Sequence, residues 1–167
     1  IRLINVYAPN NHAERREYLN ILDRWCTGNR TIILGGDFNF VENTNLDKIG
    51  GSDNYGTVGV DYIRSLKADA HLVDIYRTKH PNTVAATWTS ADGSINSRLD
   101  RFYISRSLSA QAKSVKITPS AESDHCYLDM KLQIKSVGND LRGRGFWKCN
   151  NKTLGDPDFK EDFEMLW

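Results

Sequence analysis

The segment TIILGGDFN constrains the fold more than any other, because an apolar run meets two glycines and then an acid. Thr31–Leu34 is short, aliphatic and β-branched, which is typical of a buried strand. Gly35 and Gly36 predict that the strand stops there and that the chain turns sharply. In layered α/β folds, polar groups converge on ligands where strands end. The segment therefore predicts a strand that delivers Asp37 to a site at its end.

Short apolar runs and amphipathic segments alternate along the chain. Apolar residues at helical spacing predict helices at Ala13–Trp25, Val58–Lys67 and Leu72–Lys79. Apolar or period-two runs predict a buried strand at Ile1–Tyr7 and further strands at Ala85–Thr89, Leu99–Ile104, Ser114–Thr118 and Tyr127–Ile134. Val41–Gly56 is rich in Asn, Asp and Gly and predicts a long loop. Because strands dominate the second half, we expect an α/β sandwich with mixed sheets rather than a doubly wound parallel fold.

Length and composition describe one ordinary globular domain. The chain has 167 residues, of which 40% are hydrophobic and 26% charged, so it is neither disordered nor fibrous. It has no run of about 18 apolar residues, which excludes a membrane span. A net charge of +1 excludes a uniformly basic nucleic-acid-binding protein, so any such binding must use a local patch. Three widely spaced cysteines disfavour a disulfide framework and favour a reducing, intracellular compartment.

The composition changes after the last predicted strand. Six basic residues and one acid lie within 131–152, whereas five acids and one base lie within 156–167. Asp156-Pro157 suits a helix start, with Asp as the N-cap and Pro at the first helical position. We therefore predict one domain at 1–135, and a linker with the start of another helix at 136–167. The chain lacks an initiator Met and starts inside a strand-like run, so we expect a piece of a longer protein.

Asp37 and Asn39 are the first candidates for chemistry. They lie two residues apart, so in an extended turn both side chains face the same pocket. A carboxylate in that place can hold a hard cation or orient a water molecule. Asp and Asn are also common turn formers after a pair of glycines, and the segment alone leaves both interpretations open.

Asp100 and His125 are candidates for an interacting pair. Asp100 is an acid inside a strand of mainly apolar residues, and such a group needs a partner. His125 ends the Ser123–His125 turn before another strand, and a carboxylate partner would fix the tautomer of its imidazole. The histidine can donate a hydrogen bond to a phosphoryl oxygen or move a proton. The alternatives are a plain surface strand and a solvated turn that carries an incidental histidine.

Tyr7 and Asn10 lie where the first predicted strand ends, and Pro9 stiffens that exit. A simple capping role for Asn10 is the alternative. Several other catalytic motifs are absent from the sequence, namely GxSxG, Walker A, GxGxxG and HExxH. A serine hydrolase of the nucleophile-elbow type is therefore dismissed.

Four motifs in this order, NVYAPN, GGDFN, SRLDRFYIS and SDH, resemble the endonuclease/exonuclease/phosphatase superfamily, which includes deoxyribonuclease I and the apurinic endonucleases. The resemblance covers roughly residues 1–135. Further segments, LVDIYRTKHP, ATWTS and GRGFWKCN, resemble the endonuclease of non-LTR (LINE-type) retrotransposons. The resemblance implies a two-sheet α/β sandwich of the deoxyribonuclease I-like type, incomplete at its N-terminus. It also implies that 136–167 leads toward a reverse transcriptase.

The resemblance implies catalytic roles for five residues. Asp37 would activate or orient the attacking water, and Asn39 and Tyr7 would contact the phosphate. His125 would be the catalytic histidine, and Asp100 would orient it. Five residues are expected to converge in one pocket, with Asp100 within hydrogen-bond reach of His125: Asp37, Asn39, Asp100, Asp124 and His125.

Substrate and metal positions follow from the same resemblance. Asn10, Thr87, Arg98 and Ser123 would bind substrate, and Asp124 would lie at the metal site. A principal glutamate ligand and a further asparagine precede the YxPN segment in the family, so both are expected upstream of residue 1. The piece by itself is therefore expected to be nearly inactive and to bind metal poorly.

The implied reaction is hydrolysis of a DNA phosphodiester, with Mg²⁺ or Mn²⁺ as cofactor and DNA as partner, in a nuclear protein covalently linked to a reverse transcriptase. Five basic residues are expected to follow the DNA backbone: Arg98, Arg101, Arg106, Lys113 and Lys116. Two alternatives remain open. One is another phosphoesterase of the same fold, acting on an inositol phosphate or a nucleotide, and the other is a degenerate, non-catalytic interaction domain.

Overall fold

The computed structural model describes residues 1–51 and 59–134. The chain divides into two units, Ile1–Gln133 and Ile134–Trp167, and only the first is described below. The predicted segment 136–167, with its expected helix start, lies outside the described residues. Within the described residues, no helix is long and apolar enough to cross a membrane.

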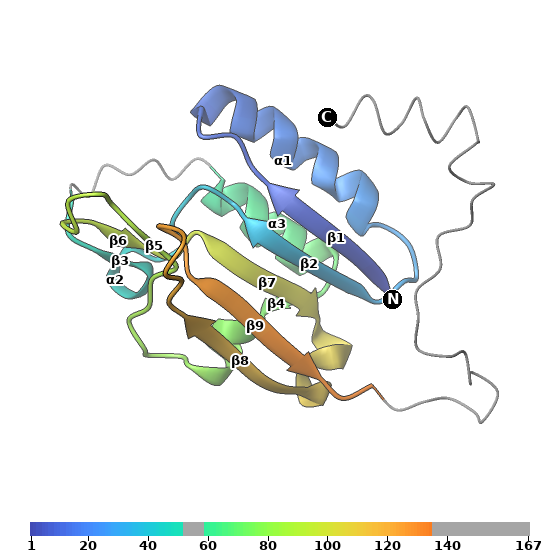
Figure 1. The fold of residues 1–167 in the computed structure, drawn as a ribbon. Coiled ribbons are helices and arrows are strands. Elements are labelled where there is room, and N and C mark those ends of the chain that lie inside the picture. The colour runs from blue at the N-terminus through green and yellow to red at the C-terminus, as the bar shows by residue number, and fades with distance from the viewer. Residues whose placement is uncertain (52–58, 135–167) are drawn as a thin grey trace, which may run out of the picture. The chain divides into compact units, whose positions relative to one another are not determined.

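A four-stranded mixed sheet forms the centre of the first unit (Figure 1). Its strands are β1 (Arg2–Tyr7), β2 (Ile32–Asp37), β7 (Asp100–Ser105) and β4 (Leu72–Asp74), in that spatial order. β1 and β2 run parallel, whereas β7 is antiparallel to both of its neighbours. The mixed pairing confirms the expectation drawn from the order of strands and helices.

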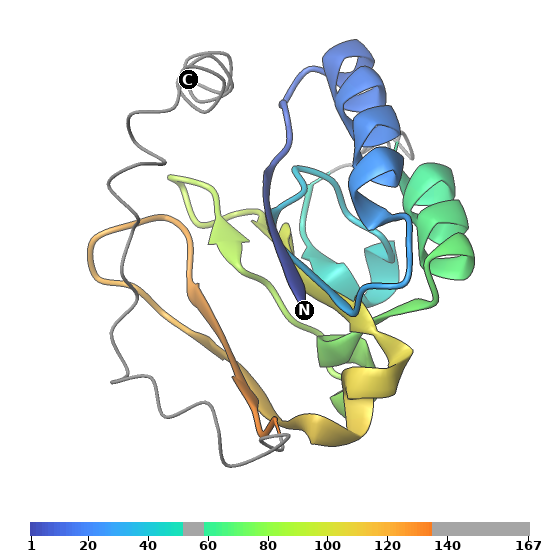
Figure 2. The ribbon, with the colours of Figure 1, turned by 90° about the vertical axis from the view of Figure 1, so that its right-hand side faces the viewer.

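Two helices, α1 (His12–Cys26) and α3 (Val60–Asp69), cover one face of this sheet (Figure 2). The Asn11 side chain caps α1 by accepting the backbone N–H groups of Ala13 and Glu14. Apolar residues of both helices and of the sheet form one buried cluster, which includes Leu19, Leu22, Ile63, Leu66, Leu34, Phe38 and Tyr103. The amphipathic patterns in the sequence therefore predicted the buried helix faces correctly.

The other face of the sheet carries the hairpin of β8 (Ala112–Thr118) and β9 (Tyr127–Leu132), seen in Figure 2. Ile33 and Ile104 of the sheet share a second buried cluster with residues of β8 and of the helices η1 (Arg106–Gln111) and α4 (Ile75–Lys79). Helices, central sheet and hairpin thus form successive layers. The layers confirm the predicted α/β sandwich.

A small sheet of β3 (Lys48–Ile49), β6 (Asn96–Ser97) and β5 (Trp88–Thr89) lies beyond the ends of β2 and β7 (Figure 1). The short helix α2 (Thr44–Asp47) leads into it. The predicted loop Val41–Gly56 was therefore wrong for α2 and β3, although residues 52–58 of it lie outside the described residues. The side chain of Asn43 caps α2, an interaction that a composition-based assignment to loop overlooks.

The two glycines do not stop β2, contrary to the prediction. A Cβ atom on Gly35 would lie 2.4 Å from the ring of Phe102, and one on Gly36, at φ 135°, would lie 2.0 Å from the backbone oxygen of Val6. The glycines therefore permit close approach of neighbouring strands inside the sheet. As a result, β2 continues to Asp37 as a paired strand residue.

Two further predictions need correction. Leu72–Lys79 is not one helix, because Leu72–Asp74 pairs with β7 and the Asp74 side chain then accepts the Arg77 N–H to start α4. β1 is not a buried strand, because it lies at the edge of the sheet and leaves Leu3 74% exposed. The other predicted helices and strands are confirmed with small shifts of their ends, except that Ala85–Thr89 shortens to β5.

Candidate active site

Three neighbouring strands bring their terminal residues to one level of the sheet. Tyr7 pairs with Asp37 across β1 and β2, and Asp37 pairs with Asp100 across β2 and β7. Residues that pair directly in adjacent strands point to the same face of a sheet. Phe102 and Ile104 follow Asp100 at period two and belong to the cluster under the β8–β9 hairpin. The carboxylates of Asp37 and Asp100 therefore stand on the hairpin face.

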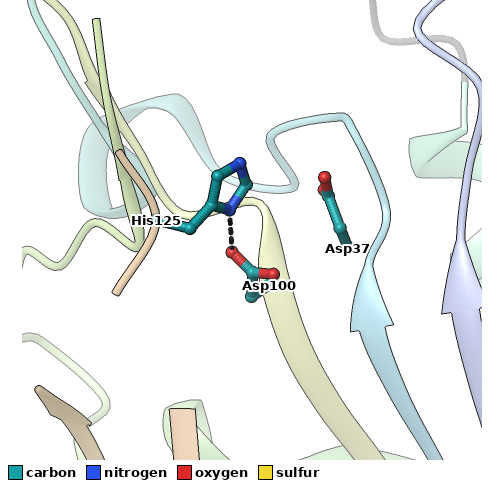
Figure 3. Close-up of side chains that lie close together, drawn as sticks. All are labelled: Asp37, Asp100 and His125. Carbon is teal, nitrogen blue, oxygen red and sulfur yellow. Dashed lines mark hydrogen bonds and ion pairs between the residues drawn. The ribbon is translucent and has the colours of Figure 1, made fainter. Parts of the chain in front are cut away.

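His125 reaches these carboxylates from the loop that precedes β9. Its Nδ1 lies 2.9 Å from Oδ2 of Asp100, as Figure 3 shows, which confirms the predicted pair. Since an ionised carboxylate only accepts hydrogen bonds, Nδ1 of His125 must carry a proton and donate it to Asp100. Nε2 is then the ring nitrogen that is free to act on a ligand. Asp37, Asp100 and His125 each offer an atom within 4.8 Å of the others.

Asp37 and Asn39 form a tight turn at the end of β2. Oδ1 of Asp37 accepts the backbone N–H of Asn39 at 2.8 Å, and Nδ2 of Asn39 donates to the Ala8 carbonyl at 2.6 Å. Asn39 has φ 51°, in the left-handed region that Asn adopts more readily than most residues. The turn therefore locks both side chains against the end of β1, and such a conformation is typical of functional sites.

A pocket of about 580 Å³ opens where these strands end. Nine residues line it: Tyr7, Asn10, Asp37, Asn39, Trp88, Leu99, Asp100, Asp124 and His125. The predicted convergence in one pocket is confirmed, while the chemical role of each residue stays a prediction. Trp88 and Leu99 were not predicted. Trp88 lies in the ATWTS segment, whose aromatic residue was the available signal.

The charges in this pocket are unbalanced. Three carboxylates and one histidine line it, and in the described part of the chain no lysine or arginine does. Burial raises the pKa of Asp37 above its ordinary value, the Asn39 N–H opposes that rise, and the nearby Asp100 adds to it. A phosphate group would be repelled by this surface unless a cation accompanied it.

The donor set fits a hard cation that is shared with a substrate. Mg²⁺ prefers oxygen ligands, and it is usually held by one or two carboxylates together with substrate phosphates. Asp124 offers such an oxygen, because among residues 1–51 and 59–134 only its Oδ2 has a hydrogen-bond partner, at 2.8 Å from Nε1 of Trp88. His125 is a poor ligand for this ion, and its Nδ1 is already held by Asp100. The Asp37–Asp100–His125 cluster is therefore better suited to proton handling than to caging a metal.

Arg98 does not reach the pocket, contrary to the expectation that it binds substrate. Its side chain is 1% exposed, and its guanidinium pairs with Asp47 at 2.7 Å and with Asp74 at 2.8 Å. The Arg77 guanidinium also contacts Asp47. Because these charges are buried, each would be uncompensated without its partner. Arg98 therefore links α2 and β4 to the segment before β7.

Thr87 is also a buried structural residue. Its Oγ1 accepts the backbone N–H groups of Leu99 and Asp100, each at 2.9 Å, and its side chain is not exposed. Its backbone oxygen accepts the N–H of Cys126, the residue after His125, at 2.7 Å. Thr87 thus bonds to the backbone beside both members of the Asp100–His125 pair. This placement contradicts a direct contact of Thr87 with substrate.

Ser123 and Arg101 also differ from expectation. Ser123 lies outside the pocket lining, and its Oγ accepts the N–H of His125 at 3.0 Å. Arg101 is fully buried and donates to the backbone oxygens of Phe40 and Arg98, at 2.7 Å each, so it cannot follow a DNA backbone. The other basic residues proposed for that role, Arg106, Lys113 and Lys116, are exposed, and their role stays a prediction.

Comparison with known proteins finds a relative in the transposon TX1 uncharacterized 149 kDa protein of Xenopus laevis. It is 32% identical over 173 residues, which cover 99% of this chain and 12% of that protein. The 3'-5' exonuclease NExo of Neisseria meningitidis has a similar fold, with a TM-score of 0.68 and 20% identity over 80% of this chain and 62% of that one. The AP endonuclease LMAP of Leishmania major has a TM-score of 0.59 and 24% identity, over 74% and 43% of the two chains.

The chain thus spans only a small part of its transposon relative and less than two thirds of these solved structures. The model of the Endonuclease/Exonuclease/phosphatase family matches residues 3–125, which begin in β1 and end at His125. That span contains every strand whose end builds the pocket, and the two structures share the deoxyribonuclease I-like fold with this chain. By sequence match and by fold, the chain belongs to the Endonuclease/Exonuclease/phosphatase family.

Proposed function

We propose that this chain is the endonuclease part of a LINE-type retrotransposon polyprotein, and that it nicks target DNA in the nucleus. The observation that carries the proposal is the Asp100–His125 pair beside Asp37 in one pocket at the sheet end. The transposon relative, a 149 kDa protein, supports the polyprotein context, and the AP endonuclease of similar fold supports DNA as the substrate. A covalently linked reverse transcriptase is part of the proposal.

In the proposed reaction, Asp37 acts on the attacking water molecule, and His125 acts on the phosphate group. Oδ2 of Asp37, the oxygen not held by Asn39, accepts the proton of a water molecule as the water oxygen bonds to phosphorus. The phosphorus–oxygen bond to one DNA strand end breaks in the same displacement, and the leaving oxygen takes up a proton from solvent water. In its doubly protonated form, with Nδ1–H held by Asp100, His125 donates a hydrogen bond from Nε2–H to a phosphoryl oxygen. Most of the catalysis is positioning and charge neutralisation, as is usual for phosphoryl transfer.

Asp124 would hold a Mg²⁺ or Mn²⁺ ion together with oxygens of the substrate phosphate. Such an ion, when bound, neutralises charge that develops on the phosphate and the leaving oxygen. The carboxylates that line the pocket support a need for such a cation, because no described basic side chain in the lining balances their negative charge. We expect chelation to abolish nicking and added Mg²⁺ or Mn²⁺ to restore it.

The deciding experiment is plasmid nicking by the full-length polyprotein with His125→Ala, at low salt with Mg²⁺. We expect a loss of at least about 10²-fold, the lower end for a positioned acid or base. His12→Ala is the matched control, because His12 is exposed at the start of α1 and lies outside the pocket lining. Full activity of a folded His125→Ala variant would refute a catalytic histidine and favour a non-catalytic domain.

Salt dependence separates DNA from a small phosphoester as substrate. Each phosphate that a protein neutralises releases counterions from DNA, so affinity falls steeply as salt rises. We expect nicking to fall by more than tenfold between about 50 and 200 mM salt. Hydrolysis of an inositol phosphate or nucleotide at a similar rate, with weak salt dependence, would favour the other phosphoesterase activity instead.

A further inference from the structure

The strand β5 holds the loop that carries Asp124 and His125. Trp88 forms a β-bridge with His125, and the N–H of Thr89 donates to the Asp124 carbonyl at 3.1 Å. The N–H of Cys126 donates to the Thr87 carbonyl at 2.7 Å. The backbone of the loop is therefore held at three successive residues. The Asp124 carboxylate can then move mainly by rotation about its side-chain bonds.

The Trp88 side chain restricts that remaining freedom. Its Nε1 donates to Oδ2 of Asp124 at 2.8 Å, which is a normal length for a hydrogen bond to an ionised carboxylate. An indole has this single N–H and accepts nothing in return, so it orients one carboxylate oxygen and leaves the other free. Trp88 and Asp124 both line the pocket, whereas Asp124 is otherwise exposed to solvent. Among the described residues, no other group donates a hydrogen bond to the Asp124 carboxylate.

We propose that Trp88 is a positioning residue for cation binding: its indole N–H holds the Asp124 carboxylate so that the free oxygen faces the pocket, while its ring forms a pocket wall. The inference rests on the proposed function, since it assigns the cation to Asp124. Groups that orient metal ligands typically change metal affinity or activity by about 10–100-fold when they are removed. Trp88 therefore acts through Asp124 rather than on the reacting atoms.

The test compares Mg²⁺ affinity of this chain with that of Trp88→Phe, which keeps an aromatic wall but lacks the N–H donor. Trp25→Phe is the matched control, because Trp25 is 56% exposed on α1 and lies outside the pocket lining. Affinity is measured by nuclear magnetic resonance, from shifts of the Asp124 and His125 amides during Mg²⁺ addition, which suits weak binding. We expect the Kd to rise about 10-fold in Trp88→Phe and to stay unchanged in Trp25→Phe.

Tryptophan emission supplies a second measurement that needs no metal. If the indole contacts the carboxylate, Asp124→Asn changes the emission of the wild-type chain. The same substitution made in Trp88→Phe leaves the emission unchanged, because the responding indole is absent. Emission of the otherwise wild-type chain that ignores Asp124→Asn would overturn the contact, even where Trp88→Phe fails to fold.

The outcomes separate this inference from the proposed function. Equal Mg²⁺ affinity of a folded Trp88→Phe variant and the wild type would overturn the positioning role while leaving cation binding intact. A wild-type chain whose Asp124 and His125 amides ignore Mg²⁺ would overturn cation binding in this chain, and the positioning role with it. In that case the emission measurement still decides whether the indole contacts the carboxylate.

Discussion

Arg98, just before β7, and Asp100, the first residue of β7, lie two positions apart in the sequence. They belong to two groups of charged residues with opposite characters. Arg98 belongs to a buried group in which it pairs with Asp47 and Asp74. Asp100 belongs to a partly buried group that is open to the pocket, in which it pairs with His125 beside Asp37. The first group joins the elements beneath the site, and the second lines the pocket. Acids and cations that look alike in the sequence therefore become either scaffold or site.

Charge balance and access to solvent separate the two groups. Burial raises the pKa of Asp47, but hydrogen bonds and attraction from Arg98 outweigh it, so the pKa lies below its ordinary value. Burial also raises the pKa of Asp37, and there the net shift stays upward. A compensated carboxylate stabilises the fold in its charged form, whereas an undercompensated one is available to take up a proton. The comparison teaches that the proposed catalytic carboxylate lies where charge compensation is incomplete.

Removing the central cation of the buried group should have the largest effect on stability. Arg98→Met keeps much of the side-chain volume but leaves Asp47 and Asp74 without their shared guanidinium. Breaking a buried pair in this way costs about 3–5 kcal/mol of unfolding free energy. Urea denaturation measures the loss. Arg64→Met is the control, because Arg64 pairs with Asp61 on the surface, and it should change stability by no more than about 1 kcal/mol.

Neutralising one acid in each group sharpens the contrast. Asp37→Asn should lower nicking by at least about 10²-fold while stability at neutral pH stays equal or rises, because the folded state disfavours the charged form of Asp37. Asp47→Asn should lower stability, because the folded state favours the charged form of Asp47. Nicking assays and thermal melting of both variants check the pair. Destabilisation by Asp37→Asn equal to that by Asp47→Asn would contradict the distinction.

Thr87 accepts the N–H of Leu99, the residue between Arg98 and Asp100, so its substitution should have an intermediate effect. Thr87→Val keeps the shape but leaves the buried N–H groups of Leu99 and Asp100 without their acceptor. An unpaired buried polar group costs about 1–3 kcal/mol. Thr87→Ser restores the acceptor and should recover the activity more than the stability, since it lacks the methyl group. Denaturation and the ratio of kcat to KM are measured together for both variants.

Thr89→Val is the matched control for that series, because Thr89 lies two residues further along the chain, in β5, and its hydroxyl donates to Asn96 at 2.7 Å instead. A rise in KM for Thr87→Val, with kcat unchanged, would favour the original expectation that Thr87 binds substrate.

A pH series should separate the two groups, and this is the smallest expected difference, because Asp37 titrates above about pH 3.8 in the folded state and Asp47 below it. The folded pKa of Asp47 lies below its unfolded value near 3.8, so its stabilisation is complete above that pH and is lost as pH falls through the folded pKa. The folded pKa of Asp37 is raised, so its contribution is complete below about 3.8 and is lost as pH rises through the folded pKa. Melting temperatures between about pH 2 and 7 measure both effects. Asp47→Asn should flatten the acid side of the curve, whereas Asp37→Asn should not.

Much of the fold could be predicted because its signals are local. The amphipathic spacing in α1 and the period-two pattern of β9 depend only on neighbouring residues, and both were confirmed. The continuation of β2 through Gly35 and Gly36 depends on Phe102 and Val6 from other strands. Likewise, the division of Leu72–Lys79 depends on pairing with β7. Such contacts between distant segments leave no periodic pattern in the sequence.

The sequence by itself determined which acids and which histidine could form the site, because GGDFN, SRLDRFYIS and SDH carry them at strand ends that can be recognised locally. Tertiary structure decided the rest. It buried Arg98 and Thr87 as supports and placed the unpredicted Trp88 beside Asp124. The physical reason is that burial and charge compensation are set by residues far away in the chain. Residue type alone therefore cannot separate a supporting arginine from one that meets a substrate.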